Sequence, residues 1–297
     1  MVRENLSNDL DYSLMNLDEL LTSTGAWLVY ESNSSKAFSS VAIDSRNVKN
    51  NSLFIPLRGE NQDGHIYIEA ALKNGAKFFV VDFDYLNENE TALLSLCKKY
   101  DASCVAVKNN LKALQDAARY YLSKFPSLYK IGITGSSGKT TTKEILASIY
   151  SKKYNTVSTK GNLNSETGLP LSVFEVRPEH EAGIFELGMN RKGEIAEIAS
   201  VLLPNAAIIT NIGTAHIGIL GTKQAIAEEK KEIFSFFDDD ALGFIPDCEF
   251  TDFLKDVSHG SIFTVSDNDS SLVQKVEDAG VSGSKIFYRG EEISFPL

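Results

Sequence analysis

A glycine-rich segment at residues 131–141, with the sequence IGITGSSGKTT, has the residue types of a phosphate-binding loop. Glycines let backbone N–H groups converge on phosphate oxygens, and a helix that begins there adds positive potential at its N-terminus. Lys139 contributes a point charge, and the hydroxyl of Thr140 can bind a magnesium ion. The segment predicts a phosphate site made by Thr134, Gly135, Ser136, Ser137, Gly138, Lys139, Thr140 and Thr141.

Three side chains further along the chain could take part in chemistry at this loop. Glu186 ends a short apolar segment, and it would face the loop if both belong to one parallel sheet, because such sheets bind ligands at the carboxyl ends of their strands. Taken alone, it could be a solvated carboxylate. A lone histidine such as His216 is more often a structural residue, and Lys230 beside Lys231 is more often part of a solvated helix face.

The elements that must position these residues alternate between strand and helix. A helix is predicted at residues 143–152, directly after the loop. Such alternation predicts an α/β fold with a mostly parallel, doubly wound sheet. The compact apolar segments that predict its strands are residues 129–134, 183–187, 206–211, 241–245 and 261–265.

The first third of the chain predicts a smaller α/β domain. Asn16 and Glu19 have the spacing of a capping box, which opens a helix at residues 17–24 that Gly25 ends. Residues 1–15 are expected to form a loose extension. The remaining elements of this domain are predicted as strands at 39–43, 52–57 and 78–82 and a helix at 66–74.

A connecting helix is predicted between the two domains. Asn109 precedes apolar residues at helical spacing, and Pro126 ends the pattern. The predicted boundaries are therefore 1–108 for the small N-terminal domain and 109–297 for the central domain.

Composition excludes several classes of protein. The 297 residues are 43% hydrophobic and 23% charged, which is typical of a globular protein with a sizeable core. A formal net charge of −11 disfavours binding to nucleic acid or to anionic membranes. The three cysteines have neither disulfide nor zinc spacing, and the first residues lack the apolar region of a secretion signal, so a cytoplasmic protein is expected. The uncharged stretch at 198–222 contains Pro204 and several glycines and polar residues, which favours a buried strand over a membrane span.

Several segments resemble the Mur ligase family, and its MurF branch in particular. The loop form T-G-x-x-G-K-T-T, with Ile133 where the general phosphate loop has its first glycine, is similar to the loop of the Mur ligase and folylpolyglutamate synthetase superfamily. Residues 42–81 look like the first domain of MurE and MurF enzymes. The segments that resemble central-domain motifs are 160–170 (KGNLNSETGLP), 186–195 (ELGMNRKGEI), 210–216 (TNIGTAH) and 226–233 (IAEEKKEI).

This resemblance implies roles for individual residues. Lys139, His216 and Lys230 are expected to be catalytic. Magnesium ligands are expected at Thr140, Glu186, His216 and Lys230, the last as a carbamate, which some relatives carry. Contacts to the UDP-sugar substrate are implied for Ser45, Arg46, Arg58, Gly59, Asp63, Gly64, His65, Asn162 and Asn164.

The resemblance also implies a reaction. ATP and Mg²⁺ would activate the terminal carboxylate of UDP-MurNAc-tripeptide as an acyl phosphate, which the amine of D-Ala-D-Ala then attacks. A monomer is expected, and relatives carry a further C-terminal domain of about 100 to 150 residues that this chain is expected to lack. Two alternatives remain open: a binding module that holds UDP-sugar and nucleotide without turnover, and another ligase such as MurE or a folylpolyglutamate synthetase.

Overall fold

The computed structural model describes residues 12–59, 62–266, 273–278, 280, 283–288 and 291–295. Its N-terminal domain contains a five-stranded sheet in the order β2-β7-β6-β5-β4, in which all neighbours are parallel except β2 and β7. The strands are β2 (Trp27–Tyr30), β4 (Ser40–Ala42), β5 (Ser52–Phe54), β6 (Ala76–Asp82) and β7 (Ser103–Val107), with a short pair formed by β1 (Met15–Asn16) and β3 (Ala37–Phe38). The helices are α1 (Leu17–Thr24), α2 (Ile68–Lys73) and α3 (Phe83–Tyr100), with 3-10 turns at Ser45–Asn47 and Gly64–Tyr67.

The capping box that the sequence predicts at α1 is confirmed. The side chain of Asn16 accepts a hydrogen bond from the Glu19 N–H at 2.8 Å, and the Glu19 carboxylate accepts one from the Asn16 N–H at 2.8 Å. Gly25 has the left-handed φ of 62° that ends the helix. The predicted extension at 1–15 lies mostly outside the described residues, but Leu14 and Met15 are buried and belong to the core.

Strands β2 and β7 and helix α3 were not predicted from the sequence. Helix α3 is 18 residues long, yet it buries only Leu93 and Cys97, so its apolar periodicity is weak. Strand β7, with the sequence SCVAV, is buried along its whole length and therefore lacks the alternation of a half-exposed strand.

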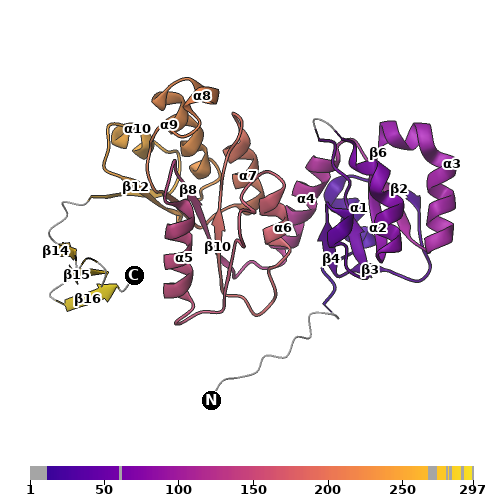
Figure 1. Cartoon of the computed structure of the whole chain (residues 1–297), viewed down its shortest axis with the longest axis horizontal. Coiled ribbons are helices and arrows are strands. Elements are labelled where there is room, and N and C mark those ends of the chain that lie inside the picture. The colour runs from indigo at the N-terminus through magenta and orange to yellow at the C-terminus, as the bar shows by residue number, and fades with distance from the viewer. Residues whose placement is uncertain are drawn as a thin grey trace, which may run out of the picture.

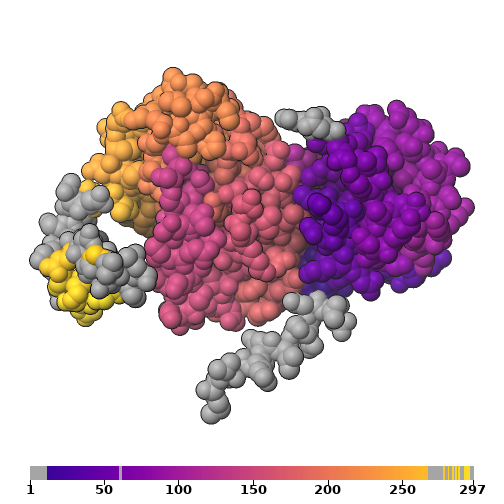
Figure 2. Space-filling model, viewed as in Figure 1, coloured from indigo at the N-terminus to yellow at the C-terminus, as the bar shows by residue number. Residues whose placement is uncertain are grey.

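Helix α4 (Asn110–Ser123) connects the two domains, as the sequence predicts, and Asn109 caps it by accepting from the Lys112 N–H at 2.8 Å. It packs against α1 on one side and against α6 (Gly168–Val173) and α7 (Glu194–Leu202) on the other. One hydrophobic cluster therefore extends through both domains, and their surfaces meet in the space-filling view (Figure 2).

Because α4 carries this shared core, Leu114→Ala is expected to destabilise the whole protein. Leu114 is fully buried, so truncation leaves a cavity that costs about 2 to 5 kcal/mol of unfolding free energy. Urea denaturation followed by circular dichroism measures this loss. The exposed Lys112 of the same helix, replaced by alanine, should change stability by less than about 0.5 kcal/mol. Equal effects of the two variants would contradict this account of α4.

The central domain contains a six-stranded parallel sheet in the order β13-β12-β11-β8-β10-β9, which confirms the doubly wound prediction. Helix α5 lies against one face of this sheet and α7 against the other (Figure 1). The strands are β8 (Tyr129–Thr134), β9 (Thr156–Ser158), β10 (Ala182–Glu186), β11 (Ala206–Ile209), β12 (Leu242–Pro246) and β13 (Ser261–Val265). The remaining helices are α5 (Lys139–Tyr150), α8 (Ile217–Leu220), α9 (Lys223–Lys231) and α10 (Thr251–Lys255), with a 3-10 turn η3 at Glu232–Phe234.

The strand order reverses at β8, whose neighbours are β10 on one side and β11 on the other. Ligands of open α/β sheets bind in the crevice at such a reversal, outside the carboxyl ends of the strands. The predicted phosphate loop follows β8 and therefore begins at this crevice.

Two smaller features complete the fold. An antiparallel sheet of β14 (Val273–Asp278), β15 (Ser284–Tyr288) and β16 (Glu291–Phe295) was not predicted. The uncharged stretch at 198–222 contains the end of α7, strand β11 and helix α8, so it is not one continuous apolar segment. In the described part of the chain, no helix has both the length and the apolar character needed to cross a membrane.

Candidate functional site

The loop between β8 and α5 has a backbone that only glycine tolerates at two positions. Gly135 has φ of +153° and Gly138 has φ of +78°. A Cβ atom on Gly135 would collide with the hydroxyl of Thr210, which follows β11. The Lys139 ammonium donates to the Gly135 carbonyl at 3.0 Å and so closes the loop on itself. Helix α5 begins at Lys139, four residues earlier than predicted, which points its first unpaired N–H groups at the crevice.

The neighbouring strand end holds this loop through Asn211. Its side-chain oxygen accepts from the Ser137 N–H at 2.9 Å, its amide donates to the Ser137 hydroxyl at 2.7 Å, and its carbonyl accepts from the Ser136 N–H at 3.1 Å. Ser136 and Ser137 are thus held in place by Asn211, and their predicted contact with phosphate stays a prediction. Thr210 and Asn211 were missed as site residues, although their place after an apolar strand was a usable signal.

Glu186 lies at the same edge of the sheet as the loop. Its carboxylate accepts a hydrogen bond from the Thr140 hydroxyl at 2.9 Å and one from the Asn164 side-chain amide at 2.7 Å. Glu186 is 2% exposed, so these two bonds replace the water that a free carboxylate would bind. The predicted pairing of Thr140 with Glu186 is therefore present in the folded chain.

This oxygen pair fits a magnesium ion. Mg²⁺ prefers oxygen ligands and usually binds one or two protein groups together with waters and substrate phosphates. The Thr140 hydroxyl and the Glu186 carboxylate supply two such groups within hydrogen-bond distance of each other. Thr140 and Glu186 would supply part of a magnesium shell, and among the described residues no cluster of three or more His, Cys, Asp or Glu side chains is placed to hold a metal.

The side chains of His216 and Lys230 lie in the same region as Lys139. Burial, with the positive charges of Lys230 and Lys139 beside it, lowers the pKa of His216. Lys230 is 1% exposed, and burial together with the Lys139 charge lowers its pKa to about 8. Lys139 and Lys230 therefore lie close enough to His216 to lower its pKa, which favours the neutral imidazole. An ammonium repels a cation, so Lys230 could ligate magnesium only as the carbamate.

Loop residues 160–168 approach Glu186 from the other side. Asn164 holds the Glu186 carboxylate and also accepts from the Gly188 N–H at 2.7 Å through its own carbonyl. Asn162 is exposed, and its carbonyl accepts from the Asn164 N–H at 2.8 Å. Asn164 therefore orients Glu186, and its predicted contact with the substrate stays a prediction.

The N-terminal domain presents two of the predicted basic residues to solvent. Arg46 is paired with Asp44, yet its side chain is 86% exposed. Arg58 is half-exposed and pairs with Asp82 at 2.9 Å. Ser45 is buried in the turn before Arg46.

Three other residues of this domain that are predicted to contact the substrate make hydrogen bonds within the protein. His65 is buried; its Nδ1 bonds the Asp63 carboxylate at 2.5 Å and its Nε2 the Asn110 amide at 3.2 Å. The Gly59 and Gly64 N–H groups donate to carbonyls of the same loop region, at 2.9 Å each. These hydrogen bonds stabilise the loop, and the predicted substrate contacts of His65, Gly59 and Gly64 stay predictions.

A cavity of about 330 Å³ lies between the two domains. Arg58, Asp82 and Lys108 line it from the N-terminal side, and Glu166 and Thr167 line it from the loop that carries Asn164. It therefore extends from Arg58 of the first domain to the loop that carries Asn164.

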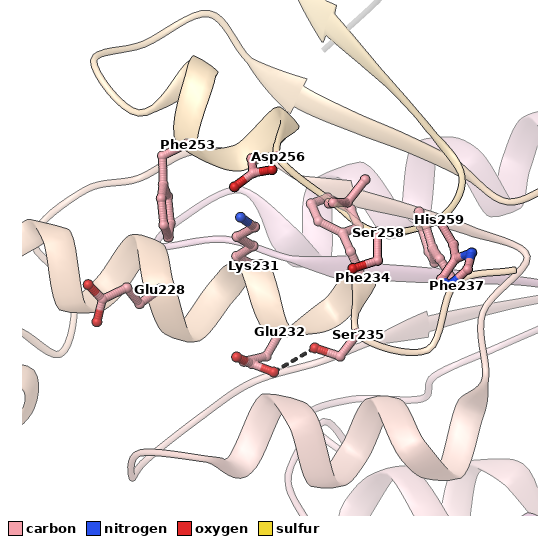
Figure 3. A pocket seen from close by; sticks show the side chains of 11 residues that line it. Glu228, Lys231, Glu232, Phe234, Ser235, Phe237, Phe253, Asp256, Ser258 and His259 are labelled. Atoms are coloured by element: carbon pink, nitrogen blue, oxygen red, sulfur yellow. Dashed lines mark hydrogen bonds between the residues drawn. The ribbon is translucent and has the colours of Figure 1, made fainter. Parts of the chain in front are cut away.

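A second cavity, of about 380 Å³, lies between α9, η3 and α10 and contains none of the predicted site residues. Figure 3 shows Lys231 pointing between Phe253 and Asp256, with its ammonium 4.3 Å from the centre of the Phe253 ring. Lys230 and Lys231 thus point to different places, which supports the selection of Lys230 for the site.

Known proteins resemble this chain in both its N-terminal and its central part. Residues 133–297 match the model of the Mur ligase middle domain, and residues 37–121 match the model of the Mur ligase family catalytic domain. The UDP-N-acetylmuramoyl-tripeptide--D-alanyl-D-alanine ligase of Treponema pallidum (strain Nichols) is 48% identical over 284 residues, 96% of this chain and 61% of that protein. The ligase of the same name from Bacillus subtilis (strain 168) is 35% identical over 77% of this chain and 47% of its own length.

Solved structures give the same result. A crystal structure of MurF from Acinetobacter baumannii has a TM-score of 0.83 and 26% identity, covering 95% of this chain and 60% of that one. MurF ligase from Thermotoga maritima in complex with ADP has a TM-score of 0.71 and 27% identity, covering 86% and 57%. The chain thus spans about three fifths or less of the length of each of these four proteins.

Proposed function

This chain belongs to the Mur ligase family, and from that premise we propose that its crevice serves an ATP-dependent ligase that joins D-alanyl-D-alanine to UDP-MurNAc-tripeptide. The 2.9 Å contact between Thr140 and Glu186 carries the proposal, because it brings a magnesium-binding carboxylate to the phosphate loop. The names of the relatives supply the substrates, and the ADP complex of one structural neighbour supports the nucleotide. The proposal places the reaction in peptidoglycan precursor synthesis in the cytoplasm.

The proposed reaction has two steps. The terminal carboxylate of the tripeptide attacks the γ-phosphorus of ATP, ADP leaves, and an acyl phosphate forms. The amine of D-Ala-D-Ala then attacks the acyl carbon, phosphate leaves, and an amide bond remains. Negative charge develops on the phosphoryl group and then on the acyl oxygen, so positive groups fixed at those atoms lower the barrier.

The residues of this chain would act by charge and by orientation. Lys139 and Lys230 stabilise the charge on the transferring phosphoryl group, and His216 adds a polar group beside them. Magnesium bound at Thr140 and Glu186 would neutralise phosphate charge. Asn164 fixes the Glu186 carboxylate in the orientation that this requires.

Lys230 has a second proposed state. Formation of a carbamate with carbon dioxide requires the neutral amine. A pKa lowered to about 8 leaves more neutral amine near pH 7 than an ordinary lysine has. The carbamate would turn Lys230 from a cationic group into an oxygen ligand for a second magnesium ion.

Phosphate release provides the test of the proposed function. A protein that contains this chain should release phosphate from ATP when UDP-MurNAc-tripeptide and D-Ala-D-Ala are both present, and the ligated product should appear in equal amount. Saturable binding of UDP-sugar and nucleotide without turnover would instead establish a binding module.

The exposed Arg46 provides a test of substrate binding by the first domain. Arg46→Ala is expected to weaken binding of the UDP-sugar about tenfold, because one charge-assisted contact to a diphosphate is lost. The melting temperature should not change, since the side chain is 86% exposed. Calorimetric titration measures the affinity. Arg119→Ala, an exposed arginine on α4, is the matched control and should bind normally. Normal binding by Arg46→Ala would remove Arg46 from the substrate site.

A further inference from the structure

Glu229 is a buried carboxylate that the proposed chemistry does not use. It is 4% exposed, and both of its oxygens accept hydrogen bonds from another element. One accepts from the Gly193 N–H at 2.8 Å and the other from the Ile195 N–H at 3.0 Å. Burying a carboxylate is costly unless such bonds compensate it, so the side chain is held firmly in this place.

The two N–H groups belong to the first turn of α7, which has no side-chain cap of its own. Gly193 is its N-cap residue, in the left-handed conformation with φ of +84°. Helix N-termini carry unpaired N–H groups and a partial positive charge, and a carboxylate satisfies both. Glu229 supplies this cap from α9, so it joins the two helices.

The position of these helices in the chain connects the cap to the phosphate site. Gly193 follows Glu186 by seven residues, at the end of the loop that leaves β10, and Glu229 directly precedes Lys230. The hydrogen bonds of Glu229 to α7 therefore link the loop that follows Glu186 to the helix that carries Lys230.

The loop before α7 is fixed independently on its other side. The buried Glu194 accepts from the Asn190 N–H at 2.6 Å and from the Glu166 N–H at 3.1 Å. The loop is thus attached to the segment that carries Asn164, which bonds Glu186. Through Glu229, α9 is therefore attached to a loop that is itself hydrogen-bonded to the segment carrying Asn164.

Helix α9 is held by packing as well as by this cap, since Ile226 and Ala227 are fully buried. The cap adds a polar attachment directly beside Lys230, whose pKa responds both to the Lys139 charge and to the Glu229 carboxylate. Loss of the cap would therefore loosen the turn of α9 that carries Lys230.

We propose that Glu229 is a positioning residue for the phosphate site, since it fixes α9 to the first turn of α7 and so holds Lys230 in place relative to Glu186. This inference rests on the proposed function for the role of the site. The attachment of α9 to α7 by Glu229 can be tested without measuring any reaction.

The test compares Glu229→Gln and Glu229→Ala with Glu228→Gln, an exposed glutamate on the same helix. Glutamine keeps the shape but can accept only one of the two bonds. Hydrogen exchange of the ligand-free protein should accelerate about tenfold in residues 187–195 and 223–231 of the Glu229 variants. The dissociation constant for the ATP analogue AMP-PNP with Mg²⁺ should rise about tenfold, while UDP-sugar binding stays within twofold. The Glu228 variant should match the unmodified protein in all three.

The outcomes distinguish the positioning role of Glu229 from the proposed function of the site. A lower melting temperature with unchanged AMP-PNP affinity, or unchanged exchange in both segments, would overturn the positioning role and leave only a helix cap. If the unmodified protein fails to bind AMP-PNP, the proposed function fails instead. Glu229→Gln serves as the deciding variant if Glu229→Ala does not fold.

Discussion

Replacing Lys139 with alanine is expected to abolish ATP-dependent ligation. The variant loses the charge that we propose acts on the transferring phosphoryl group, and it loses the bond at 3.0 Å to the Gly135 carbonyl that closes the loop. Removing one preorganised electrostatic group commonly lowers the rate by about 10² to 10³-fold, and loss of the loop conformation adds to this. Phosphate release in the presence of all substrates measures the effect.

Lys152→Ala is the control for the Lys139 variant, because Lys152 is an exposed lysine just beyond the other end of α5. It removes the same charge from the protein without touching the loop, so its rate should stay within twofold of normal. Ligation at the normal rate by Lys139→Ala would exclude the phosphate loop from the mechanism.

Replacing Glu186 with glutamine is expected to lower the rate of ligation by a similar factor, because the variant should bind magnesium more weakly. Glutamine keeps the size of the side chain but removes the negative charge that attracts magnesium. It also presents an N–H group to one of its present donors, Thr140 or Asn164. The rate at ordinary magnesium concentration should fall about 10²-fold or more, because a phosphate site without its metal loses charge stabilisation.

Magnesium titration distinguishes this cause from misfolding. The Glu186→Gln variant should recover part of its activity as magnesium is raised, whereas a misfolded protein would not. Glu179→Gln, an exposed glutamate shortly before β10, should keep the normal magnesium dependence. An unchanged magnesium dependence in Glu186→Gln would show that Glu186 does not hold the metal.

Local sequence was sufficient for five of the six strands of the central parallel sheet, all except β9. The strand at 129–134 and the helix after the loop follow from an apolar run and from glycines that permit positive φ, both of which are properties of a few neighbouring residues. The capping box at Asn16 and Glu19 is equally local. The alternation of strand and helix then restricted the fold to a doubly wound sheet.

The missed elements are those whose pattern depends on neighbours in space. Strand β7 is buried on both sides by the rest of its sheet, and β9 has only three residues and is held by β10. The burial of β7 and the pairing of β9, in which only Val157 is buried, are tertiary properties, so no periodicity in the sequence reveals them.

The residues of the site show the same contrast between local sequence and tertiary structure. The sequence by itself determined the phosphate loop, because glycine, lysine and threonine at fixed spacing constrain the backbone directly. Only the tertiary structure decided that His65 is internal, that Asn164 binds Glu186, and that Glu229 joins α9 to α7. These contacts join residues that lie far apart in the chain, and which ones meet depends on strand order and helix packing rather than on local conformation.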